Sequence, residues 1–430
     1  MDYGREMLHA YPYREVPRCW REMYSDAGIL KAFALCCLHE TPITGNDGAD
    51  ILYRESLAPL RMAITACDNV LIMAGACGHG RKPLLYDLIE AIEVKIEERE
   101  QALPSPHKRQ KKARLSSVKL EEDFDPESSP VIKCPIPRVH LPAFDVFRDH
   151  VHNPSGATPL IITGAIDHWR ARSRWTHLDS ICQAGPDRLV PIEIGNQYTD
   201  EQWTQKLVTV REFIEQYIIT PNGFSSDTNH DDDSERRQLR NQKSQRQIGY
   251  LAQHDLFDQI PRLRRDVDIP DYCLIDVNEQ QGYHPPDDVL LNAWFGPKET
   301  VSPMHTDPYH NLLAQVVGRK YVRLYSPEET SKLYPYGTFE STGKEIQRQT
   351  VNEGEEKTHD DDGQEQQERS MLNNTSQVNV ENPDLEKHPR FTEAKYVDAI
   401  LEPGDLLYIP FQWWHYIRSL SISFSVSFWF

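Results

Sequence analysis

The chain has 430 residues with 66 acidic and 47 basic side chains, and its formal net charge is -19 at neutral pH. This length allows two or three domains, and the acidic balance argues against a general nucleic-acid-binding protein, which would present a basic face. The sequence starts without a basic segment followed by an apolar core, and its apolar runs fall short of the roughly 18 residues of a membrane span. We therefore expect no secretory signal, no direct nucleic-acid binding and no membrane insertion.

The eight cysteines include the adjacent pair Cys36 and Cys37 but no CxxC or zinc-knuckle spacing. In a chain of this size, that pattern is typical of reduced thiols and not of a disulfide framework or a zinc site. We therefore expect the protein in the nucleus, the cytoplasm or both.

Residues 13–100 form the first predicted unit, a helical N-terminal region. Apolar residues recur there at intervals of three or four, within 20–35, 50–77 and 84–100. No cluster of potential ligands occurs in this region, so we expect a scaffold or a docking place for a protein partner. The apolar positions of its last helix are Leu84, Leu88, Ile92 and Ile96.

A predicted disordered linker follows at 101–130, where prolines, a basic run at 107–114 and then several acidic residues interrupt the helical pattern. The basic run has two interpretations. It could be a nuclear localisation signal, or it could be part of a solvated linker of mixed charge.

From residue 131 onward, short β-rich runs alternate with proline, glycine and asparagine, which predicts a sandwich or jelly roll. Two segments at 221–247 and 340–371 contain too few apolar residues to offset the entropy of ordering, and we expect disordered surface insertions there. In the last run, Ser423, Ser425 and Ser427 alternate with large apolar residues, which predicts a strand with one face in a core and the other on a cavity or solvent. The predicted strands lie at 160–164, 190–195, 320–325, 405–410 and 421–430.

A histidine–x–aspartate pair, His305 and Asp307, and a later histidine, His415, form the candidate metal centre. Two imidazoles and one carboxylate on one face of a metal are the facial triad of non-haem Fe(II) oxygenases, and they leave the opposite face open. Single histidines are more often ordinary surface or core residues. Here the pair precedes Asn311 and Lys320, and His415 follows a Pro-x-x-Trp-Trp run near a terminal strand, which favours the ligand interpretation.

Specific motifs follow one another in the second part of the chain, at 198–203, 249–260, 269–273, 292–297, 317–321, 374–378 and 424–429. Through these motifs, from about residue 141 to its end, the chain resembles the jumonji-C oxygenases, and most closely a group in that family that is also named for lysine demethylation. The helical N-terminal region is similar to the same group less sharply, chiefly at 19–22, and the insertions after Thr220 and Phe339 depart from the pattern. The resemblance implies a mainly β fold, a double-stranded β-helix (cupin or jelly-roll) catalytic domain at 131–430 behind the helical region.

The same resemblance implies Fe(II) as the metal, with 2-oxoglutarate and O2 as cosubstrates. It assigns the cation for the far carboxylate of 2-oxoglutarate to Lys320, and hydrogen bonds to the cosubstrate to Tyr250, Ser302 and Asn311. The hydrogen bond between this ammonium group and a carboxylate would be charge-assisted, and such bonds are stronger than those between neutral groups. The competing interpretation of Lys320 is a surface lysine at a strand edge.

Four further residues are candidates for contact with the substrate. The resemblance places Glu193 and Tyr198 near the substrate entrance, where an acidic and aromatic lining would suit a cationic side chain. Glu193 alternates with apolar neighbours, so it could instead face outward from a strand. Trp294 and Trp429 could be walls of the pocket, or they could be ordinary core residues.

These features predict an enzyme, a 2-oxoglutarate-dependent dioxygenase whose substrate is an arginine-bearing protein or a histone tail. Hydroxylation of a protein side chain, with arginine as the target, is the main hypothesis. Demethylation of histone methyl-lysine by the same chemistry is the alternative, although no zinc-finger spacing of a chromatin-reading module occurs. A non-catalytic cupin scaffold with partner-binding helices is the third hypothesis. Histone-tail cleavage ranks last, because no hydrolytic arrangement requires it.

Overall fold

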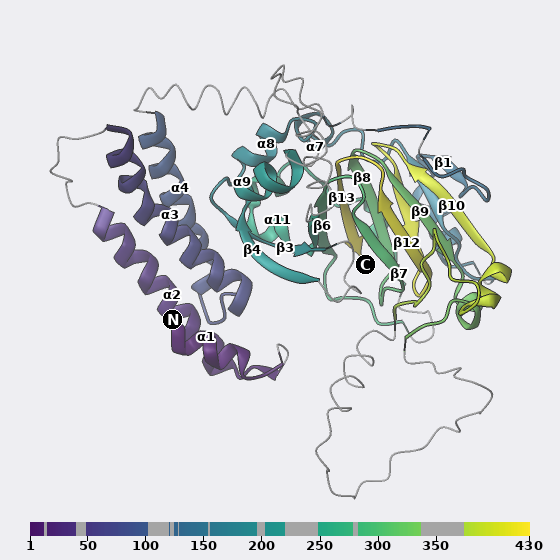
Figure 1. Cartoon of the computed structure of the whole chain (residues 1–430), viewed down its shortest axis with the longest axis horizontal. Coiled ribbons are helices and arrows are strands. Elements are labelled where there is room, and N and C mark those ends of the chain that lie inside the picture. Colours follow the sequence, from purple (N-terminus) through teal and green to yellow (C-terminus); the bar gives the residue numbers. More distant parts are fainter. Residues whose placement is uncertain are drawn as a thin grey trace, which may run out of the picture.

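The computed structural model describes residues 1–12, 15–39, 49–101, 120, 124–127, 129–153, 155–195, 203–219, 248–277, 283–336 and 374–430. The basic run at 107–114, the predicted insertions at 221–247 and 340–371, and Tyr198 all lie outside the described residues. The N-terminal helices occupy one end of the molecule and the strands of a large β-sandwich occupy the other, with α8, α9 and α11 between them (Figure 1).

The N-terminal helices are α1 (Asp2–His9), α2 (Arg18–His39), α3 (Ala49–Ala74) and α4 (Arg81–Gln101). They share a hydrophobic core of their own, to which every helix contributes. Helix α1 lies before residue 13, where the predicted helical region begins. In α4 the buried positions are Leu85, Ile89, Ile92 and Ile96. Leu84, the first of the apolar positions named in the sequence, is 42% exposed, because the helix turns the neighbouring Leu85 and Ile89 toward the core.

One stretch of α3, Leu57–Ala74, is long and apolar enough to cross a membrane when judged by length and composition alone. Half of this stretch is buried inside the protein. It also contains Asp68, whose carboxylate binds Arg188 with no exposure to solvent. These features are typical of the core helix of a folded bundle.

The strands form a nine-stranded and a four-stranded sheet, in the orders β1-β2-β11-β8-β13-β6-β5-β3-β4 and β10-β9-β12-β7. All five predicted strands are confirmed, as β2, β3, β9, β11 and β13. The nine-stranded sheet contains β1 (Arg138–His140), β2 (Leu160–Thr163), β3 (Leu189–Ile194), β4 (Thr204–Thr209), β5 (Gly249–His254), β6 (Leu290–Gly296), β8 (Asn311–Val317), β11 (Leu406–Ile409) and β13 (Ser423–Trp429). The four-stranded sheet contains β7 (Val301–His305), β9 (Lys320–Tyr325), β10 (Tyr396–Leu401) and β12 (Trp414–Ser419).

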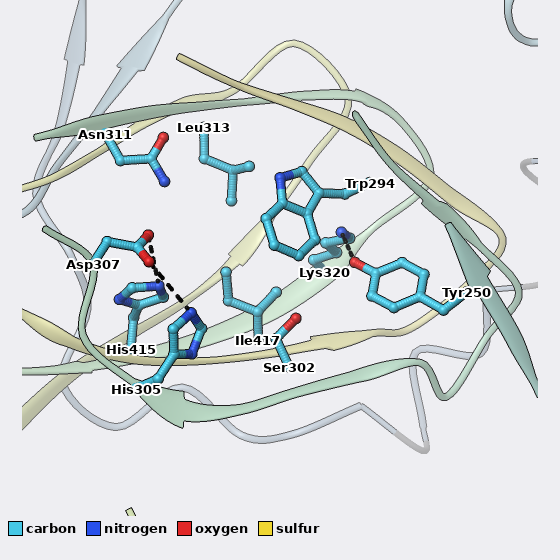
Figure 2. A pocket seen from close by; sticks show the side chains of 10 residues that line it. All are labelled: Tyr250, Trp294, Ser302, His305, Asp307, Asn311, Leu313, Lys320, His415 and Ile417. Carbon is cyan, nitrogen blue, oxygen red and sulfur yellow. Dashed lines mark hydrogen bonds and ion pairs between the residues drawn. The ribbon is translucent and has the colours of Figure 1, made fainter. Parts of the chain in front are cut away.

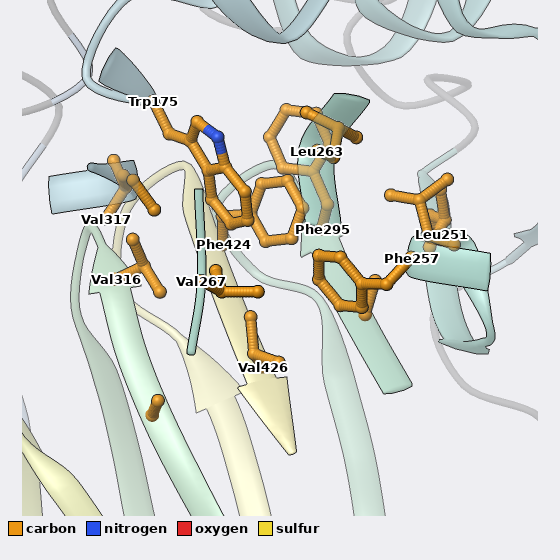
Figure 3. Packing of buried hydrophobic residues seen from close by; sticks show 14 of the residues in the cluster. Trp175, Leu251, Phe257, Leu263, Val267, Phe295, Val316, Val317, Phe424 and Val426 are labelled. Carbon is orange, nitrogen blue, oxygen red and sulfur yellow. The ribbon is translucent and has the colours of Figure 1, made fainter. Parts of the chain in front are cut away.

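Short helices cover the outer face of the nine-stranded sheet. Trp175 follows α7 and stacks on Phe424 of β13 at 4.4 Å between ring centroids, and Phe295 of β6 stacks on the other side of Phe424 at 4.8 Å (Figure 3). These aromatic side chains belong to the largest hydrophobic cluster of the molecule. The covering helices are α6 (Phe144–Val151), α7 (Ala171–Arg174), α8 (Leu178–Gln183), α9 (Val210–Phe213), continued as a π-helix at Ile214–Ile219, α11 (Leu256–Gln259) and α12 (Pro261–Arg264).

Strand β13 is buried on both faces, so of the two surroundings predicted for its serine face, a cavity or solvent, solvent is excluded. Its serines point to the interior, where Ser425 donates to the side-chain oxygen of Gln315 at 2.7 Å and Ser427 accepts from the Trp294 indole at 3.0 Å. The small hydroxyl side chains satisfy buried polar groups between the sheets, which is why a polar residue at every second position is compatible with a central strand.

Gly318, in the turn between β8 and β9, is expected to tolerate no side chain. Its φ is +72°, and a Cβ atom there would lie 1.9 Å from the carbonyl oxygen of Ile422. We expect Gly318→Ala to lower the free energy of unfolding by about 3 kcal/mol through left-handed strain and a backbone clash. Urea unfolding measures the effect. Gly156→Ala is the control, because Gly156 also has positive φ but nothing within 4 Å of the added methyl group; equal losses for the two variants would contradict the clash.

Candidate active site

A cavity opens between the two sheets, and six strands contribute side chains to it: β5, β6, β7, β8, β9 and β12. One end of the cavity carries His305, Asp307 and His415, and the other carries Lys320 and Tyr250 (Figure 2). The lining residues are Tyr250, Trp294, Ser302, His305, Asp307, Asn311, Leu313, Lys320, His415 and Ile417.

The geometry of His305, Asp307 and His415 suits a metal ion. One ligand atom from each residue lies within 4.8 Å of the other two. Strands β7 and β12 pair antiparallel with His305 directly opposite His415, so the two imidazoles project from the same face of the sheet. The Nε2 atoms lie 3.7 Å (His305) and 3.5 Å (His415) from the carboxylate oxygens of Asp307.

Backbone carbonyls orient both imidazoles. His305 Nδ1 lies 2.7 Å from the Pro303 carbonyl oxygen and His415 Nδ1 lies 3.0 Å from that of Trp413. A carbonyl can only accept, so each Nδ1 carries the proton and each Nε2 keeps a lone pair toward Asp307. Burial, assisted by the nearby His305, lowers the pKa of His415 to about 4. The ring is therefore neutral at pH 7, as a metal ligand must be.

Lys320 lies at the far end of the cavity and is 2% exposed. Its Nζ donates to the Tyr250 hydroxyl at 3.2 Å, and no carboxylate among the described residues lies within ion-pair distance of it. Burial lowers the pKa of Lys320 to about 7. An ammonium group held in such a place requires an anion for compensation, which excludes the interpretation of Lys320 as a surface lysine.

A dicarboxylate cosubstrate fits these groups. Lys320 is a buried cation without an anionic partner, and the side-chain oxygen of Asn311 is buried without a hydrogen-bond partner. Both side chains face the same small cavity as the candidate metal ligands (Figure 2). Buried polar groups in native proteins are almost always paired, so these unpaired groups are what a site for a small polar ligand would contain.

The structure brings most, but not all, of the predicted site residues together. Trp294 lines the cavity, with its indole nitrogen held by Ser427. Glu193 is half-buried on β3 and pairs with Tyr250 on β5, outside the cavity lining. Burial raises the pKa of the Glu193 carboxyl, and the neighbouring Trp203 indole partly opposes this shift. Trp429 is also outside the lining, where its ring packs on Tyr309 at 5.6 Å.

Two lining residues, Leu313 and Ile417, were not predicted. Each lies two positions after a predicted site residue on the same strand, Asn311 on β8 and His415 on β12. Side chains two apart share a face of a strand, so this periodicity could have identified both. Their apolar side chains lie beside the polar groups of the cavity and exclude water from them.

The segment 374–376 was recognised in the sequence only as a motif, and the structure places it against the candidate metal ligands. His305 forms an isolated β-bridge with Thr375. The backbone N–H of Thr306 donates to the Asn374 carbonyl and the Asn374 side-chain amide donates to the Thr306 carbonyl, each at 2.9 Å. Asn374 therefore holds the residue between His305 and Asp307 from both sides.

We expect Asn374→Ala to weaken metal binding about tenfold, since groups that orient metal ligands typically contribute 10- to 100-fold to affinity. Calorimetric titration with Fe(II) under nitrogen, or with Mn(II), measures this. Asn379→Ala is the control, because Asn379 is an exposed asparagine that accepts only from the backbone of a nearby turn. Unchanged metal affinity in Asn374→Ala would show that β12 alone suffices to orient His305.

Comparisons with known proteins all indicate the same family. Residues 144–430 match the family of cupin-like domains. The whole chain is 36% identical to "Lysine-specific demethylase 8" of Xenopus tropicalis, over 86% of that protein, and 38% identical to the protein of the same name of Danio rerio, over 85%. It is also 31% identical, again over its whole length, to "Jumonji C domain-containing protein 5" of Drosophila melanogaster, over 84% of that protein.

Proposed function

This chain belongs to the cupin-like JmjC family of 2-oxoglutarate-dependent oxygenases, and from that premise we propose that it oxidises a C–H bond of a protein side chain. The observation that supports this most is the cavity, which has two imidazoles and a carboxylate at one end and an uncompensated buried ammonium at the other. In this proposal His305, Asp307 and His415 hold Fe(II), and Lys320 binds the far carboxylate of 2-oxoglutarate, with Tyr250, Ser302 and Asn311 donating or accepting hydrogen bonds around it.

When bound, the iron and 2-oxoglutarate supply the oxidising chemistry, in which O2 and 2-oxoglutarate become succinate, CO2 and one oxygen atom inserted into the substrate. The side chains of this protein orient and shield the reactants. The carbonyls of Pro303 and Trp413 keep both Nε2 lone pairs available. Leu313 and Ile417 keep the cavity apolar beside the candidate ligands, which strengthens the charge-assisted bond at Lys320.

For the reaction itself, the names of the relatives favour demethylation of methyl-lysine over the hydroxylation of arginine that the sequence predicted. Two relatives that align over the whole chain are named lysine-specific demethylase 8, and a third, of Arabidopsis thaliana, is named lysine-specific demethylase JMJ30. We therefore propose methyl-lysine in a protein such as a histone tail as the substrate. Oxidation of the N-methyl group would release it as formaldehyde and return the amine.

Arginine hydroxylation remains a second candidate because of Glu193. Glu193 is a half-buried residue of β3 that lies opposite the lining residue Tyr250 in the strand ladder, and a carboxylate can bind a guanidinium through two parallel hydrogen bonds. A site for methylated lysine would instead surround the methyl groups with aromatic rings. Trp294 is an aromatic ring on the cavity wall, which is compatible with either substrate.

Mass spectrometry of a peptide library incubated with the purified protein, Fe(II), 2-oxoglutarate and ascorbate tests these alternatives. The library contains methyl-lysine histone-tail peptides and unmodified arginine peptides. Loss of methyl groups with release of formaldehyde would support demethylation, whereas a gain of one oxygen atom on arginine would support hydroxylation. If no succinate forms and 2-oxoglutarate does not bind, the result would contradict both reactions and support the hypothesis of a non-catalytic scaffold.

We also propose that the protein is located in the nucleus or the cytoplasm, where it would meet substrates such as histone tails. The basic run at 107–114 is the candidate nuclear signal. A fluorescent fusion of the full chain, compared with one in which these basic residues are replaced by glutamine, tests it. Unchanged nuclear accumulation of the variant would assign entry to another part of the chain.

A further inference from the structure

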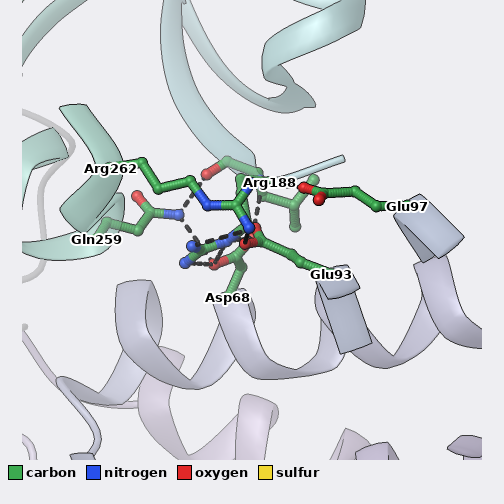
Figure 4. Close-up of polar contacts among 7 residues, drawn as sticks. Asp68, Glu93, Glu97, Arg188, Gln259 and Arg262 are labelled. Atoms are coloured by element: carbon green, nitrogen blue, oxygen red, sulfur yellow. Dashed lines mark hydrogen bonds and ion pairs between the residues drawn. The ribbon is translucent and has the colours of Figure 1, made fainter. Parts of the chain in front are cut away.

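A buried polar network joins the N-terminal helices to the catalytic sheet (Figure 4). At its centre is Asp68 of α3, which has no exposure to solvent. Arg188, immediately before β3, donates to its carboxylate from Nη2 at 2.6 Å and from Nε at 3.0 Å. The backbone N–H of Leu189, the first residue of β3, donates to it at 2.7 Å. The helical unit is therefore hydrogen-bonded to the first residue of β3, which belongs to the other unit.

Gln259 of α11 extends this network to a second strand. Its amide nitrogen donates to Asp68 at 3.1 Å and to the Leu189 carbonyl at 2.5 Å. Its side-chain oxygen lies 2.5 Å from Nε2 of His254, the last residue of β5. Because the Gln259 nitrogen already donates, its oxygen accepts and His254 Nε2–H donates. Asp68 and Gln259 thus connect the first residue of β3 with the last residue of β5.

This connection replaces hydrogen bonds that the sheet itself lacks. Strands β3 and β5 pair at only two positions, Glu193 with Tyr250 and Ile194 with Gly249. Continued along both strands, that register brings Leu189 opposite His254, but β5 has left the regular ladder there. Its pairing with β6 shifts between Leu251 and His254, and Gln253 has a φ of +47°. The side chain of Gln259 spans the separated strand ends.

We propose that Asp68 is a positioning residue, which acts from the N-terminal helical unit through Gln259 to fix β3 against β5 and thereby places Tyr250 in the cavity. The inference rests on the proposed function, in that Tyr250 and its partner Lys320 are taken to bind 2-oxoglutarate. The network joins Leu189 and His254 at one end of β3 and β5, and the ladder pairs Glu193 with Tyr250 four positions along the same two strands. The Tyr250 hydroxyl accepts from Lys320.

The chemistry of the network favours positioning over simple stabilisation. A buried ion pair contributes little compared with apolar side chains of the same volume, because both charges must lose their water. Directional bonds do fix geometry, and the Asp68 carboxylate accepts from Arg188, Leu189 and Gln259 together. A hydrophobic contact in the same place would join the two units but would not set the separation of the strand ends.

The experiment uses the full chain loaded with Mn(II) and measures calorimetric binding of 2-oxoglutarate and thermal unfolding. Asp68→Asn and Gln259→Met are the test variants. Gln259→Met keeps the pair of Asp68 with Arg188, so it removes the link to His254 while retaining the ion pair. Arg61→Ala is the matched control, because Arg61 joins the same two units through Asp187 at 3.2 Å and also binds Glu100 at 3.0 Å, but it reaches neither strand.

We expect 2-oxoglutarate to bind about tenfold more weakly in both test variants, since a small misplacement far from the chemistry can reduce function by that order or more. Arg61→Ala should bind it as the unmodified protein does. Gln259→Met with unchanged 2-oxoglutarate affinity would overturn the inference even if Asp68→Asn did not fold. Failure of the unmodified protein to bind 2-oxoglutarate would instead overturn the proposed function, so the two failures are distinguishable.

Discussion

Asp307→Ala is expected to abolish turnover while the protein remains folded. The Asp307 carboxylate faces both Nε2 atoms, at 3.7 and 3.5 Å, and it is the only acidic member of the candidate metal group found in the described residues. Without it, only the two imidazoles remain, which bind Fe(II) too weakly and leave its geometry open. We expect metal affinity to fall by more than about a hundredfold, beyond the typical effect of groups that only orient ligands. Metal titration and succinate formation measure this.

The fold should survive because the Asp307 side chain has no role in the hydrophobic clusters of the sandwich. Circular dichroism and the unfolding midpoint establish that point. Asp288→Ala is the control, since Asp288 is an exposed carboxylate outside the cavity. Turnover retained in Asp307→Ala would remove this residue from the proposed metal centre.

Lys320→Ala is expected to raise the concentration of 2-oxoglutarate required for half-maximal binding by about a hundredfold, the equivalent of roughly 3 kcal/mol for a charge-assisted bond in a buried site. The Nζ of Lys320 is buried at the end of the cavity with the Tyr250 hydroxyl as its acceptor. Calorimetry with the Mn(II)-loaded protein measures the change. An unchanged dissociation constant would assign the far carboxylate to another group.

Lys320 also predicts a pH dependence for cosubstrate binding. Burial lowers its pKa to about 7, so the ammonium form that binds a carboxylate is lost as pH rises through about 7. Binding of 2-oxoglutarate should weaken above that pH and should take up a proton from the buffer. Lys320→Arg is the control, because a guanidinium stays charged. If both proteins weaken equally between pH 6 and 9, another group is responsible.

The same shift has a consequence for stability, with the sign determined by linkage. Between pH 7 and 10.5, the unfolded chain binds a proton at Lys320 that the folded chain does not. The contribution of this residue to stability therefore falls as pH is lowered from 10.5 to about 7 and is constant below that. The site retains a group whose charge opposes folding, which is typical of residues kept for binding rather than for stability.

Several features followed from local patterns in the sequence. Short β-branched and aromatic runs between turn residues predicted five strands that the structure contains, because these residues suit a pleated sheet in almost any context. Proximity of His305 and Asp307 also followed from sequence, since only one residue separates them along the chain. The periodicity of 84–100 predicted a helix, which the structure contains as α4. It did not show that Leu84 is exposed, because a local pattern does not show where the neighbouring helix lies.

What the sequence determined by itself was therefore the set of elements and the types of chemical group available, a mainly β catalytic unit with two imidazoles, a carboxylate and a lysine. Only the tertiary structure decided which of these groups meet. His415 faces His305 because β12 pairs with β7 in one register, and Lys320 has a pKa near 7 because the two sheets close over it. Asp68, Arg188 and Gln259 lie far apart along the chain, and together with His254 they form one network across two units. Contacts of this kind depend on packing between distant segments, which no local pattern of residues encodes.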